Sequence, residues 1–361
     1  MNICFVNSTR KWGGVKSWTL DLAQGLNLRG HNILIVARSG SFVIACQDQN
    51  LETLDIVFGA DFNPARIVYF LKLFRTKNID LVVVNVGKDM RTAGVAARIL
   101  HIPVVHRVGL SGDMENTWKV SLMHKWVRPK ILVPCQEIKH GLLQKLPHLN
   151  AHEIQVIHTG KKPAVALPVT VQTPLRLVST SQLNADKGHG DILQALAILK
   201  NQGYSFEYHV AGTGRIEEQL KAQAKNLDLT DSIFWHGFTQ NVRQLLRTCD
   251  IFLLPSLSEG LPNALLEAMA EGLVCVARNV GGIKEVWPPQ KTQYLLPRKA
   301  CPKDFAQILQ ELFTMSSDQI TNLRQIFWQQ GQGNSLETMV CSFEHFASTL
   351  LANSGPKKLS K

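Results

Sequence analysis

The sequence predicts an α/β protein with two doubly wound, Rossmann-like halves. Short apolar segments alternate with amphipathic segments of helical length along most of the 361 residues, the pattern of parallel strands joined by crossover helices. A proline-rich stretch, 163–174, interrupts this alternation, which then restarts. Two such halves are expected to face one another across a cleft, because open α/β sheets bind ligands at the carboxyl ends of their strands.

The first half, residues 1–162, begins with a strand in NICFVN and a helix in VKSWTLDLAQGLNLRG. The loop between them holds Gly13 and Gly14, which allow a ligand to approach the backbone closely or simply make a tight turn. Further strands are expected in NILIVA, IDLVVVNV and IPVVHRV, and further helices in PARIVYFLKLFRTKN and TAGVAARILH. His106 is expected to follow the last of these strands.

The second half, residues 175–335, repeats the pattern after the linker at 163–174. Its expected strands are LRLVSTS, FEYHVAG, SIFWHG, DIFLLPS and LVCVAR, and its expected helices span 188–202, 215–227, 239–248 and 262–271. The tail from 303 to 352 is also predicted to be helical. Residues 336–361 are expected to form a C-terminal helix that packs back on the first half, followed by a frayed end.

Composition excludes several classes of protein. Hydrophobic residues make up 45% of the chain and charged residues 19%, which is ordinary for a globular protein. The start of the chain is not a secretory signal, and no apolar stretch is long enough to span a bilayer. The seven cysteines are dispersed, which favours reduced thiols and a cytoplasmic location. Without a D-x-D motif or a Cys/His cluster, no metal is expected.

The net charge of +11 is concentrated in the first half. Residues 1–162 hold 21 Lys and Arg against 11 Asp and Glu, whereas residues 163–361 hold 18 against 17. Two stretches there, 69–77 and 115–130, mix basic and aromatic residues, including Trp118 and Trp126. Such surfaces fit the inner face of an anionic membrane, although a core-packed helix with a solvated basic face is an equal alternative. No nucleic-acid-binding module is present.

Two glutamates seven residues apart are the strongest candidates for chemistry. Glu259 follows an apolar strand, and Glu267 lies on the helix after it, which is expected to begin at Pro262 and to end before Gly272. The amino end of that helix attracts anions. Two carboxylates beside an anion site suit a ligand with phosphate in its middle and hydroxyls at both ends, such as a nucleotide sugar.

The segment PSLSEGLPNALLEAMAEGLVCVARNVGGIKEV resembles the signature of retaining glycosyltransferase family 4, which has the GT-B fold. NADKGHGDILQALAIL, YHVAGTGRIEEQL and IFWHGFTQNVRQLLRTCDIF match the donor-binding domain of that family in order and spacing. The resemblance is strong over residues 175–290 and weaker over the first half, which it assigns to the acceptor. There it rests on WGGVKSWTLDLAQGLNLRGH and IPVVHRVGLSG.

The resemblance assigns roles to individual residues. Glu259 would bind hydroxyls of the donor sugar with help from backbone amides near Gly260 and Leu261, and Glu267 would hold the ribose. Lys187, in the loop of NADKGHGD, would stabilise the leaving diphosphate. The family places an arginine five residues before that lysine, whereas this chain has Gln182 there, which can donate a hydrogen bond but carries no charge.

Other positions follow from the same resemblance. His106 is expected to contact the sugar of the donor. Gly13 and Gly14 are expected near the diphosphate of the donor, and Gly237 and Phe238 near its nucleotide base. Lys16 and Arg107 are alternatives for an acceptor phosphate. Gly212 and Gly214 are expected to be mainly structural, since GTGRIE lacks the third glycine of a dinucleotide fingerprint. Arg176 and Arg215 are near Gln182 in the sequence.

The resemblance therefore predicts a retaining hexosyltransferase that needs no cofactor. Its donor would be a UDP-sugar, with GDP- and ADP-sugars as alternatives. Its acceptor would be a membrane-associated glycolipid or oligosaccharide in lipopolysaccharide or surface polysaccharide biosynthesis. An epimerase of sugar nucleotides with the same fold and a catalytically lapsed sugar-nucleotide-binding protein remain alternatives, the latter because of Gln182.

Overall fold

The computed structural model describes residues 1–10, 12–167, 170–239 and 241–353. The chain divides into two compact units, one of residues 1–159 with 336–361 and the other of residues 160–335. The first boundary thus falls three residues before the expected end of the first half, so Lys161 belongs to the second unit. The linker positions 168 and 169 and the expected frayed end, 354–361, lie outside the described residues.

The first unit is built on a seven-stranded sheet with the order β3-β2-β1-β4-β5-β6-β7. All of its neighbouring strands run parallel. The strands are β1 (Asn2–Asn7), β2 (Asn32–Ala37), β3 (Glu52–Asp55), β4 (Leu81–Val84), β5 (Val104–Arg107), β6 (Lys130–Val133) and β7 (Ile154–Val156). The strand order reverses between β1 and β4, which makes the carboxyl ends of these two strands the switch point of the sheet.

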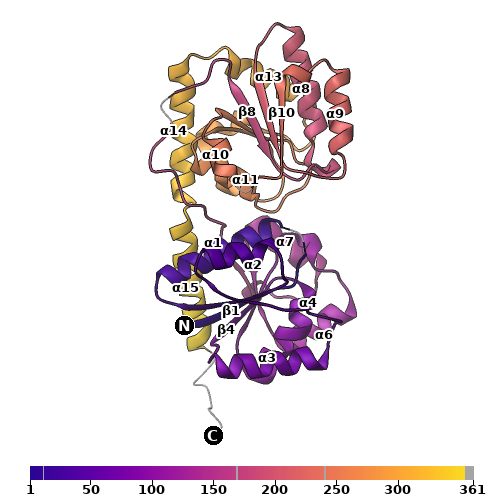
Figure 1. Cartoon of the computed structure of the whole chain (residues 1–361), viewed down its shortest axis with the longest axis vertical. Helices are drawn as coiled ribbons and strands as arrows, with labels where there is room; N and C mark the ends of the chain where they lie inside the picture. The colour runs from indigo at the N-terminus through magenta and orange to yellow at the C-terminus, as the bar shows by residue number, and fades with distance from the viewer. Residues whose placement is uncertain (11, 168–169, 240, 354–361) are drawn as a thin grey trace. The chain divides into compact units, whose positions relative to one another are not determined.

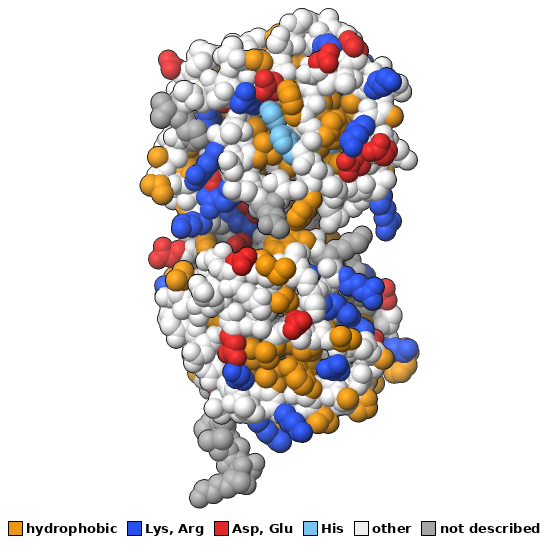
Figure 2. Space-filling model, viewed as in Figure 1, with side chains coloured by type: hydrophobic (Ala, Val, Ile, Leu, Met, Phe, Trp, Pro, Cys, Tyr) orange, Lys and Arg blue, Asp and Glu red, His pale blue; other side chains and the backbone are white. Residues whose placement is uncertain are grey.

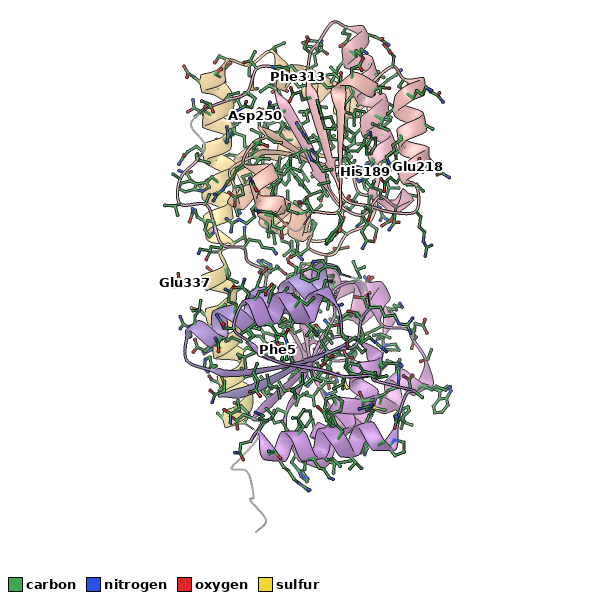
Figure 3. All side chains as sticks on the ribbon, viewed as in Figure 1. Phe5, His189, Glu218, Asp250, Phe313 and Glu337 are labelled. Carbon is green, nitrogen blue, oxygen red and sulfur yellow. The ribbon has the colours of Figure 1, made fainter. Side chains whose placement is uncertain are left out.

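Helices cover both faces of this sheet (Figure 1). They are α1 (Gly14–Leu28), α2 (Ser41–Asp48), α3 (Pro64–Thr76), α4 (Gly87–Asp89), α5 (Val95–Ile99), α6 (Trp118–Val127), α7 (Gln136–Lys145) and α15 (Leu336–Ala352). Phe5 of β1 faces a core made with α1, α2 and α15 (Figure 3). Its neighbour Cys4 faces a second core made with α3, α5 and α6. This alternation is the period of two that a strand buried on both faces requires.

The second unit has a six-stranded parallel sheet with the order β10-β9-β8-β11-β12-β13. Its strands are β8 (Arg176–Thr180), β9 (Glu207–Ala211), β10 (Ile233–Gly237), β11 (Ile251–Leu254), β12 (Val274–Arg278) and β13 (Leu295–Leu296). Its helices are α8 (His189–Asn201), α9 (Glu217–Asn226), α10 (Val242–Leu246), α11 (Asn263–Ala270), α12 (Ile283–Val286), α13 (Pro302–Phe313) and α14 (Ser317–Gly333). The switch point lies between β8 and β11.

Three expected positions differ in the structure. Gly14 is the first residue of α1 rather than a loop residue, and only Gly13 precedes the helix. Pro262 is the residue before α11, with an extended ψ of 121°, so the helix begins one position later than expected. His106 lies inside β5, paired with Val84 and Ile131, rather than after the strand. Gly272 does end α11 as expected, in the left-handed conformation with φ +74°.

No helix among the described residues is long and apolar enough to cross a membrane. All seven cysteines, each of which lies in the described part of the chain, carry free thiols.

Candidate active site

The two strands at the switch point of the second unit carry the central pair of candidate residues. Lys187 follows β8 and Glu259 follows β11, and Lys187 Nζ lies 2.7 Å from Glu259 Oε1. The two side chains are 19% and 13% exposed, so the pair is sheltered yet reachable from solvent. The sequence positions are far apart, and the fold alone brings them together at the edge where doubly wound sheets bind ligands.

The two loops that carry this pair are joined by their backbones. The amide of Leu257 donates to the carbonyl of Asp186 at 2.8 Å. Gly188 adopts φ +70°, and a Cβ there would overlap the carbonyl oxygen of Pro255. A side chain at position 188 would therefore separate the loops, and only glycine lets Lys187 approach Glu259 in this way.

The loop after β12 supports the Glu259 loop from its other side. Gly281 has φ +56°, and a Cβ there would overlap the carbonyl oxygen of Glu259. The amide of Gly282 donates to the carbonyl of Gly260 at 2.7 Å. The predicted amide-donating residues Gly260 and Leu261 are themselves buried, and the carbonyl of Gly260 is engaged by this neighbouring loop.

A buried guanidinium, that of Arg278 at the end of β12, ties these loops together. It donates to the carbonyl of Pro255, to the carboxylate of Asp191 in the first turn of α8, and to the carbonyl of Ala300 at 2.7 Å. Its carbon centre also lies 5.1 Å from the centroid of the Phe305 ring. Arginine suits such a place because its planar fork can donate to several acceptors at once. No local pattern in the sequence marks Arg278 for this role.

Glu267 also has a lysine partner, which sequence analysis missed. Lys161 Nζ lies 2.8 Å from Glu267 Oε1, and the two side chains are 8% and 22% exposed. Each of the two candidate glutamates is therefore paired with one lysine. No local pattern around Lys161 in GKKP marks it, because its partner is distant in the sequence.

Gln182 stands in the exposed loop after β8, and its side-chain oxygen accepts from Asn184 Nδ2 at 3.0 Å. Neither nearby arginine takes the place of the absent charge. Arg176 is at the opposite, amino end of β8 and pairs with Glu207 at 2.6 Å. The side chain of Arg215 is exposed, and only its backbone amide reaches this loop, donating to Asn184 Oδ1 at 3.4 Å.

Two glycines of the GTGRIE turn pack against the same loop. A Cβ on Gly212 would overlap the carbonyl oxygen of Ser181, and one on Gly214 would overlap that of Leu183. Both positions therefore require the absence of a side chain for this packing. Gly237 has φ +61° and accepts from the amide of Gly212 at 2.7 Å, while Phe238 beside it is 57% exposed. An exposed aromatic ring of this kind is available to stack on a planar ligand.

His189 locks the start of α8 to the end of β8 (Figure 3). Its Nε2 lies 2.8 Å from Ser181 Oγ, and its ring is buried. Burial, with a smaller contribution from the nearby charge of Lys187, lowers the pKa of His189 to about 4. The ring is therefore neutral at physiological pH, so it adds no charge beside Lys187.

In the first unit, His106 is buried and touches another histidine. Its ring centroid lies 5.6 Å from that of His124, which in turn lies 5.7 Å from that of His148. Burial, with a smaller contribution from His124, lowers the pKa of His106 to about 3. A neutral ring can accept or donate a hydrogen bond, but it brings no positive charge to a ligand.

The remaining candidates of the first unit lie near the switch point of its sheet. Gly13 has an extended backbone, and no atom lies within 4 Å of the position a Cβ would take there. Lys16 is buried and donates to the carbonyl of Arg10 at 3.2 Å. Arg107 is buried with its guanidinium carbon 5.0 Å from the centroid of the Trp18 ring. Both cations thus have protein partners.

Among the described residues, no group of three or more His, Cys, Asp or Glu side chains could hold a metal ion.

Two family models together match most of the chain. The model described as "Glycosyltransferase Family 4" matches residues 12–163, and that described as "Glycosyl transferases group 1" matches residues 169–332. An uncharacterised glycosyltransferase of Haemophilus influenzae is 33% identical over 306 residues, which cover 81% of this chain and 84% of that protein. The chain belongs to glycosyltransferase family 4. Its sheets and switch points are those of the GT-B fold of this family.

Other relatives of this transferase match over shorter segments. The amylovoran biosynthesis glycosyltransferase AmsK of Erwinia amylovora is 38% identical over 158 residues, which cover 41% of this chain and 39% of that protein. An Escherichia coli UDP-Gal:α-D-GlcNAc-diphosphoundecaprenol α-1,3-galactosyltransferase is 24% identical over 244 residues, which cover 60% of this chain and 62% of that protein. This chain thus spans less than two thirds of the length of each of these two relatives.

Among solved structures, the Anabaena protein HepE in complex with UDP and glucose is similar over 97% of this chain and 100% of its own, with a TM-score of 0.79. Sequence identity is 18%, so this likeness shows the shared fold.

Proposed function

We propose that this transferase moves a hexosyl group, with retention of configuration, from a nucleoside diphosphate sugar to a hydroxyl of a membrane-associated glycolipid in lipopolysaccharide or surface polysaccharide biosynthesis. The observation that carries the proposal is the Lys187–Glu259 pair at the switch point of the second unit, 2.7 Å apart. Binding a diphosphate requires a positive charge, which Lys187 supplies. Binding a sugar requires a group that accepts hydrogen bonds from its hydroxyls, which the carboxylate of Glu259 supplies.

In the proposed reaction, the acceptor oxygen forms a bond to the anomeric carbon while the bond from that carbon to the diphosphate oxygen breaks. The departing diphosphate keeps the electron pair, and its oxygen takes the proton of the acceptor hydroxyl. Lys187 and the amino end of α11 stabilise the charge that develops on the diphosphate. Glu259 orients the sugar, Glu267 holds the ribose, and His106 contacts the donor sugar. The lysine and the helix end do the work of a metal, so no metal is required.

A UDP-sugar is the favoured donor, with GDP- and ADP-sugars as alternatives. HepE, with the same fold, was crystallised with UDP and glucose, and the E. coli relative is named for a UDP-Gal donor. The name of that relative also includes a diphosphoundecaprenol-linked acceptor, and AmsK is named for polysaccharide biosynthesis. These names support a lipid-linked acceptor and a cytoplasmic location at the membrane.

The test is thermal unfolding with UDP, GDP, ADP and their sugar conjugates, followed by turnover. One nucleotide should raise the unfolding temperature of the wild type, since a ligand that binds only the folded state stabilises it. Glu267→Ala should reduce that shift, and Lys187→Ala should lower turnover by about 100-fold or more, the scale of a lost electrostatic contact to a developing anion. The anomeric configuration of the product, read by NMR, tests retention.

Three outcomes would contradict this function. A wild type that none of the nucleotides stabilises would exclude the proposed donor site. Binding without turnover on any lipid-linked glycan would identify a lapsed enzyme, in agreement with the neutral Gln182. Conversion of the donor sugar in the absence of acceptor would identify an epimerase.

Full activity in the presence of EDTA is expected, and its loss would mean that a metal takes part.

A surface on α6 supports membrane docking. Trp118, Leu122 and Trp126 recur every four residues on one helix face and are 72%, 59% and 45% exposed. Lys119 and Lys125 are exposed on the same helix, and Lys119 Nζ lies 5.8 Å from the Trp118 ring centroid. The helix, WKVSLMHKWV, holds no acidic residue. The alternative of a core-packed helix does not account for three exposed apolar side chains.

On the face shown in Figure 2, Lys and Arg side chains stand beside hydrophobic ones over the part of the first unit where Figure 1 draws α3 and α6. Tryptophan prefers the interface of a bilayer, and lysine is attracted to anionic lipid. We therefore propose that α6 lies on the anionic inner leaflet.

Co-sedimentation with vesicles tests this docking. The wild type should bind vesicles that contain phosphatidylglycerol and not those of phosphatidylcholine alone. Trp118→Ser combined with Trp126→Ser should weaken binding about tenfold or more, since each buried aromatic ring contributes on the order of 1–2 kcal/mol. Leu28→Ser, at an apolar residue 80% exposed on α1, is the matched control and should bind as the wild type does. Equal binding by the wild type, the double tryptophan variant and Leu28→Ser would exclude α6 as the membrane-binding surface. If α6 instead mediates self-association, the wild type should have a larger mass in solution than the double tryptophan variant.

A further inference from the structure

Lys161 is a buried lysine with no role so far in the proposed reaction. Its side chain is 8% exposed and its Nζ lies 2.8 Å from Glu267 Oε1. Its amide donates to the carbonyl of Asn334 at 3.1 Å, and it forms a parallel bridge with Ser335. The two segments that enter and leave the second unit therefore hold the backbone of Lys161 in place, and its charge is directed to the glutamate on α11.

The positive charge of Lys161 offsets a repulsion that Glu267 would otherwise exert on a bound diphosphate. An unpaired carboxylate on α11 would repel the diphosphate that the amino end of that helix attracts. The salt bridge to Lys161 offsets the charge of Glu267, as the bridge to Lys187 offsets that of Glu259. Because both side chains of the Lys161–Glu267 pair are largely buried, solvent screens this contact less than it would screen a surface pair.

The contact also fixes the orientation of the carboxylate. Lys161 engages the carboxylate through Oε1, at 2.8 Å. A carboxylate held through one oxygen presents the other in a defined direction, which suits acceptance from one particular pair of hydroxyls. Without the lysine, the Glu267 side chain would be free to change rotamer.

We propose that Lys161 is a positioning residue that determines the preference of the donor site for ribose over 2′-deoxyribose, acting through Glu267. The inference rests on the proposed function, in which Glu267 holds the ribose of the nucleotide. Lys161 makes no contact with the donor in this scheme. Its effect is on the discrimination between two nucleotides that differ in one hydroxyl.

Calorimetric titration with UDP and with 2′-deoxy-UDP measures that discrimination. The wild type should bind UDP roughly 10- to 100-fold more tightly, the worth of a hydrogen bond to a charged group. In Lys161→Met, the affinity for UDP should exceed that for 2′-deoxy-UDP by no more than about threefold. Glu267→Ala gives the ratio expected when the contact to the ribose is absent. Lys161→Arg should restore most of the ratio because it keeps a cation at this position. If GDP or ADP is the nucleotide that binds, the same pair of ligands is used with that base.

Two further variants separate the explanations. Lys162→Met removes the adjacent exposed lysine and should keep the ratio of the wild type, which controls for net charge. Lys161→Gln keeps a hydrogen-bond donor but removes the charge, and it replaces Lys161→Met in the titration if that variant does not fold. An unchanged ratio in both Lys161→Met and Lys161→Gln, or an equal loss of affinity for both nucleotides, would overturn the inference while leaving the donor site intact. A wild type that binds none of the nucleotides would instead overturn the proposed function and this inference with it.

Discussion

At the scale of single residues, the site is organised by close backbone contacts that only glycine permits. Gly188 and Gly281 lie on either side of the Glu259 loop, both with positive φ, and a Cβ on either would overlap a carbonyl oxygen of that loop. These overlaps involve backbone rather than flexible side chains, so the loop itself would have to move. The position of the Glu259 carboxylate thus depends on residues that have no functional group.

Gly281→Ala is therefore expected to impair the proposed donor site. The left-handed conformation costs a side chain about 1–2 kcal/mol, and the overlap with the Glu259 carbonyl adds displacement of the loop. We expect turnover to fall by about 100-fold or more, because misplacement of a catalytic group by about 1 Å has that effect. Steady-state kinetics measures it.

Gly203→Ala is the control, because Gly203 has φ +87° with open space around its Cβ position. It should lower stability by a similar amount and leave turnover unchanged. Equal turnover in the two variants would mean that the overlap at position 281 is relieved without moving Glu259.

At the scale of elements, β5, α6 and the turn after α7 bring together the rings of His106, His124 and His148. Burial lowers the pKa of His106 to about 3 and that of His124 to about 4, and it lowers the pKa of His148 as well. The unfolded chain takes up protons near pH 6.5, where the folded protein does not. The stability that these rings contribute is therefore present above about pH 6.5 and is lost as the pH falls from there toward 4.

His124→Phe should flatten this dependence. At pH 5 each buried ring costs up to about 2 kcal/mol of stability relative to neutral pH, and phenylalanine keeps an aromatic ring between its two neighbours without titrating. Urea unfolding at pH 5 and pH 7.5 should show a smaller difference in the variant than in the wild type. His152→Gln, at an exposed histidine, should leave the difference as it is. A variant with the full acid sensitivity of the wild type would mean that other groups dominate.

The alternation of apolar and amphipathic segments predicted two parallel-sheet halves, with four of the seven strands of the first unit and five of the six strands of the second. It also placed Lys187 and Glu259 in loops that follow strands. It could not predict contacts that depend on where distant loops meet. Lys161 and Arg278 have no local signature, because a buried cation is defined by partners that the fold supplies. The one-residue errors at Gly14 and Pro262 have a different cause, since glycine and proline fit the position before a helix as well as its first turn.

At the scale of the whole molecule, the chain returns from the second unit to complete the first. Phe343 and Val340 on α15 lie in the same core as Phe5 on β1, and a Cβ on Gly25 of α1 would overlap Val340. The last helix is thus part of the core of the first unit, although more than 170 residues of the second unit separate the two in the sequence. The first unit cannot bury its core until the second has been synthesised.

Phe343→Ala should therefore loosen the first unit selectively. Truncation of a buried phenylalanine costs about 3–5 kcal/mol, and the cavity lies beneath β1 and β2. Hydrogen exchange followed by mass spectrometry should show faster exchange in peptides of β1, β2 and α1, while those of β8, β11 and α11 keep their protection. Nucleotide-induced stabilisation of the second unit should persist. Ser342→Ala, at the adjacent exposed residue, should exchange like the wild type. Equal acceleration in both units would show that the two unfold as one cooperative body, and α15 would then be a support for the whole protein rather than for the first unit alone.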